Sequence, residues 1–303
     1  MDFFIVPLEV GLLYAVMAVG VYLTYRVLDF PDLTVDGSFT MGAATTAVLI
    51  VGGTAPWLAL LVGTLAGLVA GVVTGALHAF GGINPLLAGI LTQIGLWSIN
   101  LRIMGKANIP LLRHDTIFTP LRDHQLLGTW ASVAILAAAA AVVVVGVWWF
   151  LRTSYGVAIR ATGDNQQMAS SQGINTRWTK IVGLALSNAL VALCGGAVAQ
   201  FQGYSDISMG VGLVVAGLAS VIVGQAIFGM SKLWQAILAA AAGSIIYRTA
   251  IQFALEQGLN PNDMKLISAL LVIAALIIPK WAPLRRMRMR MRRRAAAPPE
   301  VTP

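Results

Sequence analysis

The chain has 303 residues, of which 58% are hydrophobic and only 11% are charged. An ordinary soluble domain carries about a quarter charged residues, so this composition excludes that class of protein. Cys194 is the single cysteine, which excludes an intrachain disulfide, and its apolar neighbours predict a buried packing role. The formal net charge is +8, and seven arginines lie between Arg285 and Arg294, directly after the last apolar block. This placement predicts that the tail binds anionic lipid, and that no nucleic acid is bound.

Apolar blocks long enough to cross a bilayer recur along the chain, since a membrane helix needs about 20 residues. The first block is too long for the core of a signal peptide and lacks a basic segment before it, so we expect no cleavable signal. We predict an all-α, polytopic transmembrane helical bundle in residues 1–281, followed by a disordered basic cytoplasmic tail at 282–303. About nine spans (eight to ten) are expected, at 3–27, 38–53, 56–80, 85–104, 129–151, 181–202, 210–228, 234–256 and 264–281.

The distribution of basic residues orients these spans, because cytoplasmic loops carry an excess of Lys and Arg. The loop 152–180 is basic, so we place it in the cytoplasm. Counting spans outward then puts the N-terminus outside and the C-terminus in the cytoplasm. The loop 105–128 disagrees, since it would be external and yet contains Lys106, Arg113 and Arg122. Nearby acidic residues partly balance this charge, and the rule is statistical, so the orientation stands.

Two segments of similar character suggest an internal repeat. Residues 36–38 open an apolar stretch that a helix led by Trp57 follows, and residues 206–210 open a similar stretch before a helix led by Trp234. An odd number of spans separates the two copies, so they would run in opposite directions. Inverted repeats of this kind place a binding site where broken helices meet near the middle of the membrane. The alternative is a shared membrane composition without common ancestry.

Four glycines recur at intervals of four residues in the third predicted span. Gly63, Gly67, Gly71 and Gly75 therefore lie on one stripe of the helix. Small residues at this spacing let another helix approach closely, so we predict a packing role and assign them no chemistry.

The connection between the first two spans, residues 28–38, has the composition of a break between helices. Pro31 stops a helix, Gly37 frees the backbone, and Asp36 or Ser38 can cap the helix that follows. A half-helix that starts here would present free N–H groups and the positive end of its dipole to a ligand. The alternative is a plain cytoplasmic turn with solvated acids.

A second informative segment lies within the loop 152–180. Asp164 is a candidate N-cap, with Gln167 three residues later completing a capping box. Gly163 can end the preceding helix and Gly173 the following one. We predict a short helix at 165–172 on the inner face, where a cytoplasmic motor subunit could push it. The alternative is an ordinary capped helix in a loop.

Polar residues inside apolar spans indicate a cavity or a partner, because burying them in a bilayer is unfavourable. Gln93, Trp97 and Asn100 share one helix face. Glu9 and Arg248 have matched depths, so we predict that they form an ion pair; independent contact with the outer headgroups is the alternative. The residues expected to line a solute path are Asp29, Asp32, Thr34, Asp36, Ser38, Gln93, Asn100, Asn188, Asp206 and Arg248.

The sequence has no constellation that would support an enzyme. Three histidines and one cysteine do not have the spacing of a metal site, and the phosphate-binding loop Gly-x4-Gly-Lys-Ser/Thr is absent. We therefore expect no cofactor and no metal, and any use of ATP must occur on another chain.

Three segments resemble a known family: LDFPDLTVDGSFTMGAATTA, SYGVAIRATGDNQQMASSQGIN and SDISMGVGLVVAGLASVIVG. They are similar to the branched-chain amino acid/ribose-type permeases of bacterial ABC importers, and most similar to the subgroup of tryptophan/tyrosine or uncharacterised transport permeases. The resemblance covers about residues 8–280. It implies an inner-membrane permease for an amino acid or a similar small solute, and it does not identify that solute.

The same resemblance implies partners. These are two permease copies, two ATPase subunits and an external solute-binding protein. It also implies that the loop 152–180 holds the helix that docks on the ATPase, with contacts from Gly156, Arg160, Gly163, Asp164, Asn165, Ala169, Gly173 and Ile174. The alternative function is a self-sufficient secondary transporter or channel, which would need a coupling-ion site among the few acids within the spans.

Overall fold

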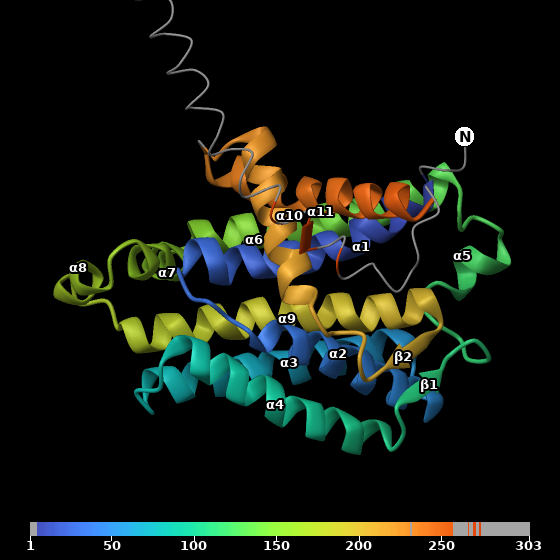
Figure 1. Cartoon of the computed structure of the whole chain (residues 1–303), viewed down its shortest axis with the longest axis horizontal. Helices are drawn as coiled ribbons and strands as arrows, with labels where there is room; N and C mark the ends of the chain where they lie inside the picture. The colour runs from blue at the N-terminus through green and yellow to red at the C-terminus, as the bar shows by residue number, and fades with distance from the viewer. Residues whose placement is uncertain (1–4, 231, 257–265, 267–268, 271–272, 274–303) are drawn as a thin grey trace, which may run out of the picture.

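The computed structural model describes residues 5–230, 232–256, 266, 269–270 and 273 (Figure 1). The predicted tail, 282–303, lies outside the described residues, as does most of the predicted ninth span, 264–281. The helices are α1 (Ile5–Tyr22), the π-helical turn η2 (Leu23–Val27), α2 (Thr34–Val51), α3 (Pro56–Ala79), α4 (Pro85–Met104), α5 (Thr119–Asp123), α6 (Trp130–Arg152), α7 (Ser154–Asp164), α8 (Gln166–Ser171), α9 (Thr176–Gln202), α10 (Leu213–Phe228) and α11 (Leu233–Glu256). The strands are β1 (Asn108–Pro110) and β2 (Tyr204–Asp206).

Within the described part of the chain, 7 helices are long and apolar enough to cross a membrane, and α10 is a shorter apolar helix. The prediction of a polytopic helical bundle is therefore confirmed. The long helices lie side by side, with α7 and α8 at one end of the bundle (Figure 1). The start of α1, α5 and the strands lie at the other end. There β1 pairs antiparallel with β2, with Ile109 opposite Ser205, so the segments 105–128 and 204–206 meet at one end.

Three predicted helix starts differ from the structure. The second span begins at Thr34 rather than at residue 38, because Asp32 Oδ1 accepts a hydrogen bond from the Thr34 backbone N–H at 2.8 Å. Asp36 and Ser38 therefore lie inside α2 and do not cap it. The span predicted at 181–202 begins at residue 176. The span predicted from residue 210 begins at residue 213, and this helix, α10, is the short one with 16 residues.

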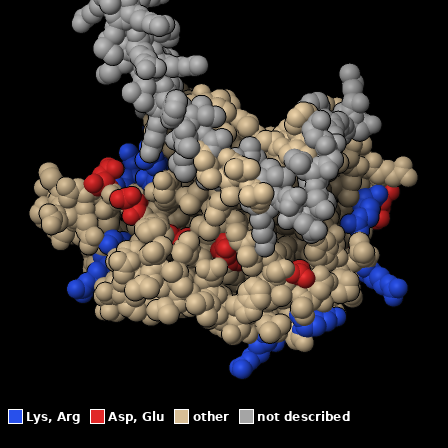
Figure 2. Space-filling view, in the orientation of Figure 1, with Lys and Arg blue, Asp and Glu red and all other residues tan. Residues whose placement is uncertain are grey.

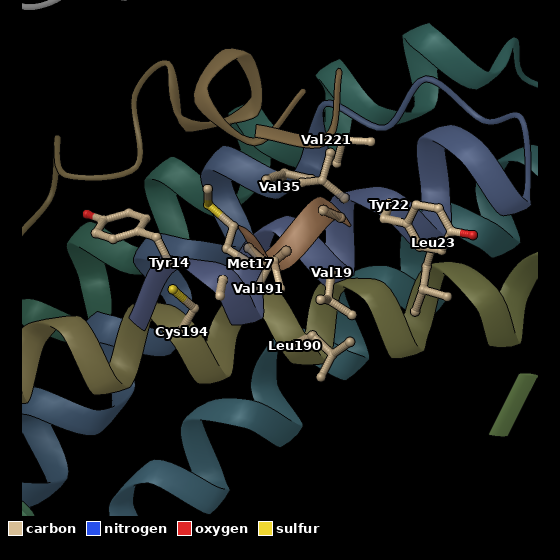
Figure 3. Close-up of a cluster of buried hydrophobic side chains, with 14 of the residues drawn as sticks. Tyr14, Met17, Val19, Tyr22, Leu23, Val35, Leu190, Val191, Cys194 and Val221 are labelled. Carbon is tan, nitrogen blue, oxygen red and sulfur yellow. The ribbon is translucent and has the colours of Figure 1, made fainter. Parts of the chain in front are cut away.

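The hydrophobic core lies where α1, α2, α9 and α10 meet. Figure 3 shows Met17 of α1, Val35 of α2, Val191 of α9 and Val221 of α10 in one cluster of buried side chains. Cys194 lies in the same cluster, and its thiol lies 3.2 Å from the Leu13 carbonyl oxygen. The cysteine is thus a buried packing residue.

The glycine stripe of α3 lies where that helix approaches α9 and α2. A Cβ atom on Gly67 would lie 2.2 Å from the Ala192 Cβ, and one on Gly71 would lie 2.4 Å from the Leu184 carbonyl oxygen. The Cβ positions on the other two glycines of the stripe are equally crowded, with Gly75 against α9 and Gly63 against α2. Only glycine allows the helices to pack at this distance, since any larger residue would overlap backbone atoms.

The helix contacts have the pattern that an inverted repeat predicts. The helix α3 packs against α2 and α9, and α11 packs in the same way against α10 and α1. The helices α1 and α9 run in opposite directions along the bundle (Figure 1). Exchanging α1, α2 and α3 for α9, α10 and α11 therefore reproduces these contacts, with the direction reversed for the pair α1 and α9.

Candidate functional site

The starts of α2 and α10 meet inside the bundle. One carboxylate oxygen of Asp36 accepts a hydrogen bond from the Gly212 N–H at 2.8 Å, and the other accepts one from the Val214 N–H at 2.7 Å. These N–H groups belong to the first turn of α10, where the helix dipole favours a negative charge. Gly210 allows the close approach, since a Cβ atom there would lie 2.1 Å from the Asp36 carbonyl oxygen. The two segments that suggested a repeat thus contact each other through Asp36.

A pocket lies beside this junction, between α2, α4 and the turn before α10. We call it the central pocket, and its lining residues are Asp36, Gly37, Thr40, Gln93, Trp97, Asn100 and Val211. Its empty volume is about 230 Å³, part of which is open to solvent. Because this volume includes space open to solvent, the central pocket is too small to enclose an organic solute in this conformation.

Helix α4 lies close to α2 at the central pocket. Asn100 Nδ2 donates a hydrogen bond to the Gly37 carbonyl oxygen at 3.2 Å. A Cβ atom on Gly37 would lie 2.8 Å from Leu96 Cδ1, so the Leu96 side chain would have to shift to accept a larger residue here. The face of α4 that carries Gln93, Trp97 and Asn100 therefore points at the start of α2, as their spacing in the sequence indicated.

A buried hydrogen-bond network ties α2 to its neighbours without lining the pocket. Asn188, in the middle of α9, donates to Asp32 Oδ2 at 2.8 Å and accepts from the Ser38 hydroxyl at 2.7 Å. The hydroxyls of Thr34 and Thr74 lie 2.8 Å apart, which joins α2 to α3. Asp32, Thr34, Ser38 and Asn188 were predicted to line the solute path, but in this conformation they fix the position of α2.

Asp29, Asp206 and Arg248, which were also predicted for the path, lie away from the central pocket. Asp29 is exposed in the connection before α2, with a φ of 51°. Asp206 is in β2, where partial burial would raise its pKa, but hydrogen bonds from Ser208 and Asn108 outweigh this effect and lower the pKa below its usual value. Of the ten predicted path residues, the central pocket contains Asp36, Gln93 and Asn100.

The predicted ion pair between Glu9 and Arg248 is wrong. A carboxylate oxygen of Glu9 accepts hydrogen bonds from the Gly128 N–H, at 2.9 Å, and from the Ser132 hydroxyl at the start of α6. The Arg248 guanidinium lies over the Tyr14 ring, 3.5 Å from its centroid, as a cation–π contact. The two residues were matched by depth alone, and depth does not determine which side of its helix each one occupies.

The helix predicted at 165–172 is present as α8, with a different start. Asn165 is its N-cap, and the Asn165 side chain accepts a hydrogen bond from the Met168 N–H at 2.9 Å. Asp164 is instead the last residue of α7. Gly163 lies inside α7 and does not end it; a Cβ atom there would lie 1.9 Å from the Val27 carbonyl oxygen, so glycine allows α7 to pack on η2. Gly173 follows α8 with a φ of 80°.

A chain of polar contacts connects α8 to the membrane helices. Lys180 Nζ of α9 donates to Gln166 Oε1 of α8 at 2.8 Å and lies 3.0 Å from His78 Nε2 of α3. The other ring nitrogen of His78 lies 2.8 Å from the Ile83 carbonyl oxygen, in the turn before α4. The remaining residues predicted for the coupling region lie in α7, in α8 and directly after α8: Gly156, Arg160, Ala169 and Ile174.

Helices that begin inside a membrane bundle, beside a pocket that contains polar groups, are typical of solute-translocating membrane proteins. The chain belongs to the family described as branched-chain amino acid transport system / permease component, whose model matches residues 7–277. It is therefore the membrane-spanning permease subunit of an ABC importer for small solutes, in a bacterial inner membrane. It is not itself an enzyme, since ATP hydrolysis occurs on separate ATPase subunits, and it works with a solute-binding protein.

The individual relatives agree with this assignment. The chain is 42% identical over 266 residues to the tyrosine transport system permease protein of Clostridioides difficile, covering 88% of each chain. It is 32% identical over 280 residues to an uncharacterized protein of Rickettsia prowazekii, covering 91% of this chain and 97% of the relative. It is 25% identical over 267 residues to the galactofuranose transporter permease protein of Escherichia coli, covering 87% and 75%. No solved structure matches the chain.

Proposed function

We propose that the chain imports an aromatic amino acid of the tyrosine class, along a path that includes the central pocket. The observation that carries this proposal is the meeting of the α2 and α10 starts beside a pocket that contains both polar groups and an aromatic ring. Trp97 is 45% exposed and provides a flat apolar surface, on which an aromatic side chain can stack. The 42% identity to a tyrosine permease supports the same substrate class.

The transport assay should use the permease with its ATPase and solute-binding protein in proteoliposomes. We expect ATP-dependent uptake of L-tyrosine, with competition by L-tryptophan and L-phenylalanine and none by ribose. Replacement of Trp97 by Ala should lower the uptake rate by about tenfold, because an aromatic stacking contact of about 1 kcal/mol and the buried ring surface are both lost.

The matched control is Trp149→Ala on α6, because Trp149 is 66% exposed and does not line the pocket. Its uptake should match that of the wild type. Equal uptake by the Trp97 and Trp149 variants would contradict a path through the central pocket. Uptake of ribose without uptake of any amino acid would contradict the proposed substrate class.

We propose further that the end of the bundle formed by α7 and α8 faces the cytoplasm and contacts the ATPase. The N-terminus would then lie outside and the C-terminus inside. Arg152, Arg160 and Arg177 support this orientation, since they belong to the α7–α8 end. Figure 2 shows Lys and Arg toward both ends of the molecule and along its lower edge, with Asp and Glu among the residues between them. The contacts of Lys180 with Gln166 and His78 would carry a displacement of α8 to α9 and α3.

Cysteine crosslinking tests this contact. Met168 in α8 is 63% exposed, so a Met168→Cys variant should crosslink to the ATPase subunit within the assembled complex. Leu112→Cys is the control, since Leu112 is 70% exposed at the opposite end of the bundle. The native Cys194 is buried and should contribute little background. Crosslinking through Leu112 but not through Met168 would reverse the proposed orientation.

From the family resemblance we also propose that two copies of the permease assemble with two ATPase subunits, and that the basic tail binds anionic lipid. The tail lies outside the described residues, so the support for its role is the run of arginines from Arg285 to Arg294.

A further inference from the structure

Asn100 has a buried acceptor atom that the protein does not use. The residue is 1% exposed, and its Nδ2 donates to the Gly37 carbonyl oxygen at 3.2 Å, but its Oδ1 has no hydrogen-bond partner among the described residues. Buried carbonyl oxygens are nearly always paired, so this one requires an explanation. Exchanging the oxygen and nitrogen of the amide would place Oδ1 against the Gly37 oxygen, two acceptors facing each other. The observed orientation is therefore the one that the surroundings favour.

The groups around the Asn100 Oδ1 atom favour a ligand group that is positively charged and can donate a hydrogen bond. Asn100 lines the central pocket, which contains the Asp36 carboxylate and no basic side chain. The Thr40 hydroxyl donates to the Asp36 carbonyl oxygen at 3.2 Å, so its proton is already used. Both carboxylate oxygens of Asp36 accept N–H groups from α10, which fixes the orientation of the carboxylate beside the pocket. An ammonium group would meet a free acceptor and a nearby carboxylate at this position, whereas a carboxylate would meet no basic side chain there.

We propose that Asn100 Oδ1 accepts a hydrogen bond from the ammonium group of the transported solute. This inference rests on the proposed function and deepens it, since it names the group of an amino acid that the central pocket recognises. In the present conformation the Oδ1 atom is closed off and the pocket is small. Separation of α4 from α2 exposes the atom, and the ammonium group then supplies the missing donor, while Trp97 contacts the apolar part of the solute.

Two substitutions separate this role from a purely structural one. Asn100→Asp keeps an acceptor oxygen but loses the donor to Gly37, whereas Asn100→Leu has a similar size and loses both. If the acceptor matters, Asn100→Asp should import several-fold faster than Asn100→Leu, although more slowly than the wild type because its second oxygen faces the Gly37 oxygen. Asn100→Leu should fall by about tenfold or more, because a lost hydrogen bond to a charged group is worth at least that factor. If only the bond to Gly37 matters, the two variants should lose uptake equally, which would overturn the proposal.

The assay measures initial uptake rates in proteoliposomes, with basal ATP hydrolysis and folded yield recorded for each variant. The solutes are L-tyrosine, L-leucine and ribose. If Asn100→Leu fails to fold, Asn100→Ala replaces it in the comparison. Equal losses of uptake in Asn100→Asp and Asn100→Ala would then overturn the proposal. If the wild type takes up L-leucine but not L-tyrosine, the aromatic substrate class is contradicted. The Asn100 variants are then compared with L-leucine as the solute. Wild-type uptake of ribose alone, or of none of the three solutes, would overturn the Asn100 proposal.

Discussion

Gly67→Val should reduce the yield of folded permease to near zero. A Cβ atom at this position would lie 2.2 Å from the Ala192 Cβ and 2.7 Å from the Asn188 carbonyl oxygen. Part of the obstacle is the backbone of α9, which cannot rotate away as a side chain can. The helices α3 and α9 would have to separate, and overpacking of this kind costs about 1–3 kcal/mol or more even where the core can adjust. The separation would also disturb Asn188, which holds Asp32 and Ser38 in place.

The same substitution at two other glycines provides the control. Gly95 in α4 and Gly146 in α6 are helical, and an added Cβ atom would meet nothing within 4 Å at either position. Gly95→Val and Gly146→Val should therefore give yields close to the wild type. Yield is measured by extraction into detergent followed by size-exclusion chromatography, with the melting temperature of any folded fraction. Equal yields for all three variants would show that α3 and α9 tolerate a larger separation than the structure has.

The helical class of the fold could be predicted from the sequence because length and hydropathy decide whether a segment crosses a membrane. Helix starts were less predictable, because several neighbouring residues can each accept the first N–H groups. Residues 32, 36 and 38 all carry suitable oxygens, and the start of α2 was assigned to the wrong ones. Only the tertiary contacts decide: Asn188 holds the Asp32 carboxylate, while Asp36 is engaged by α10.

The same limit applies to the start of α8. Asp164 and Asn165 are both good N-cap residues, and the sequence pattern favoured the first. The close contact between Gly163 and the Val27 carbonyl oxygen extends α7 through Asp164, so Asn165 becomes the N-cap. The glycine that had the pattern of a helix stop thus has a packing function that no local pattern could indicate.

Part of the central pocket was predictable and part was not. The spacing of Gln93, Trp97 and Asn100 placed them on one helix face, and that face does point at α2. Val211 could not be predicted, because its place in the pocket depends on a contact between segments 176 residues apart in the sequence. The Glu9–Arg248 pairing failed for the related reason that depth in the membrane leaves the facing direction of each side chain undetermined.

Asp36→Ala should nearly abolish solute uptake and lower the thermal stability of the permease. The Asp36 carboxylate accepts the N–H groups of Gly212 and Val214, and the shorter side chain would leave both without a partner at the start of α10. Each hydrogen bond to a charged group contributes about 1.5–3 kcal/mol, so the loss of two exceeds the effect of most single substitutions. Asp36→Asn should have an intermediate effect, because its amide oxygen can accept one N–H group while its NH₂ group faces the other.

Asp29→Asn is the matched control for the charge change, since Asp29 is exposed in the connection before α2 and Asn tolerates its φ of 51°. This variant should import and melt as the wild type does. The measurements are the initial uptake rate in proteoliposomes and the melting temperature in detergent, which separate a folded but inactive permease from an unfolded one. We expect the order wild type, Asp36→Asn, Asp36→Ala in both quantities. An Asp36→Ala permease with wild-type stability and uptake would mean that the start of α10 does not depend on Asp36, and the junction would then have no part in the solute path.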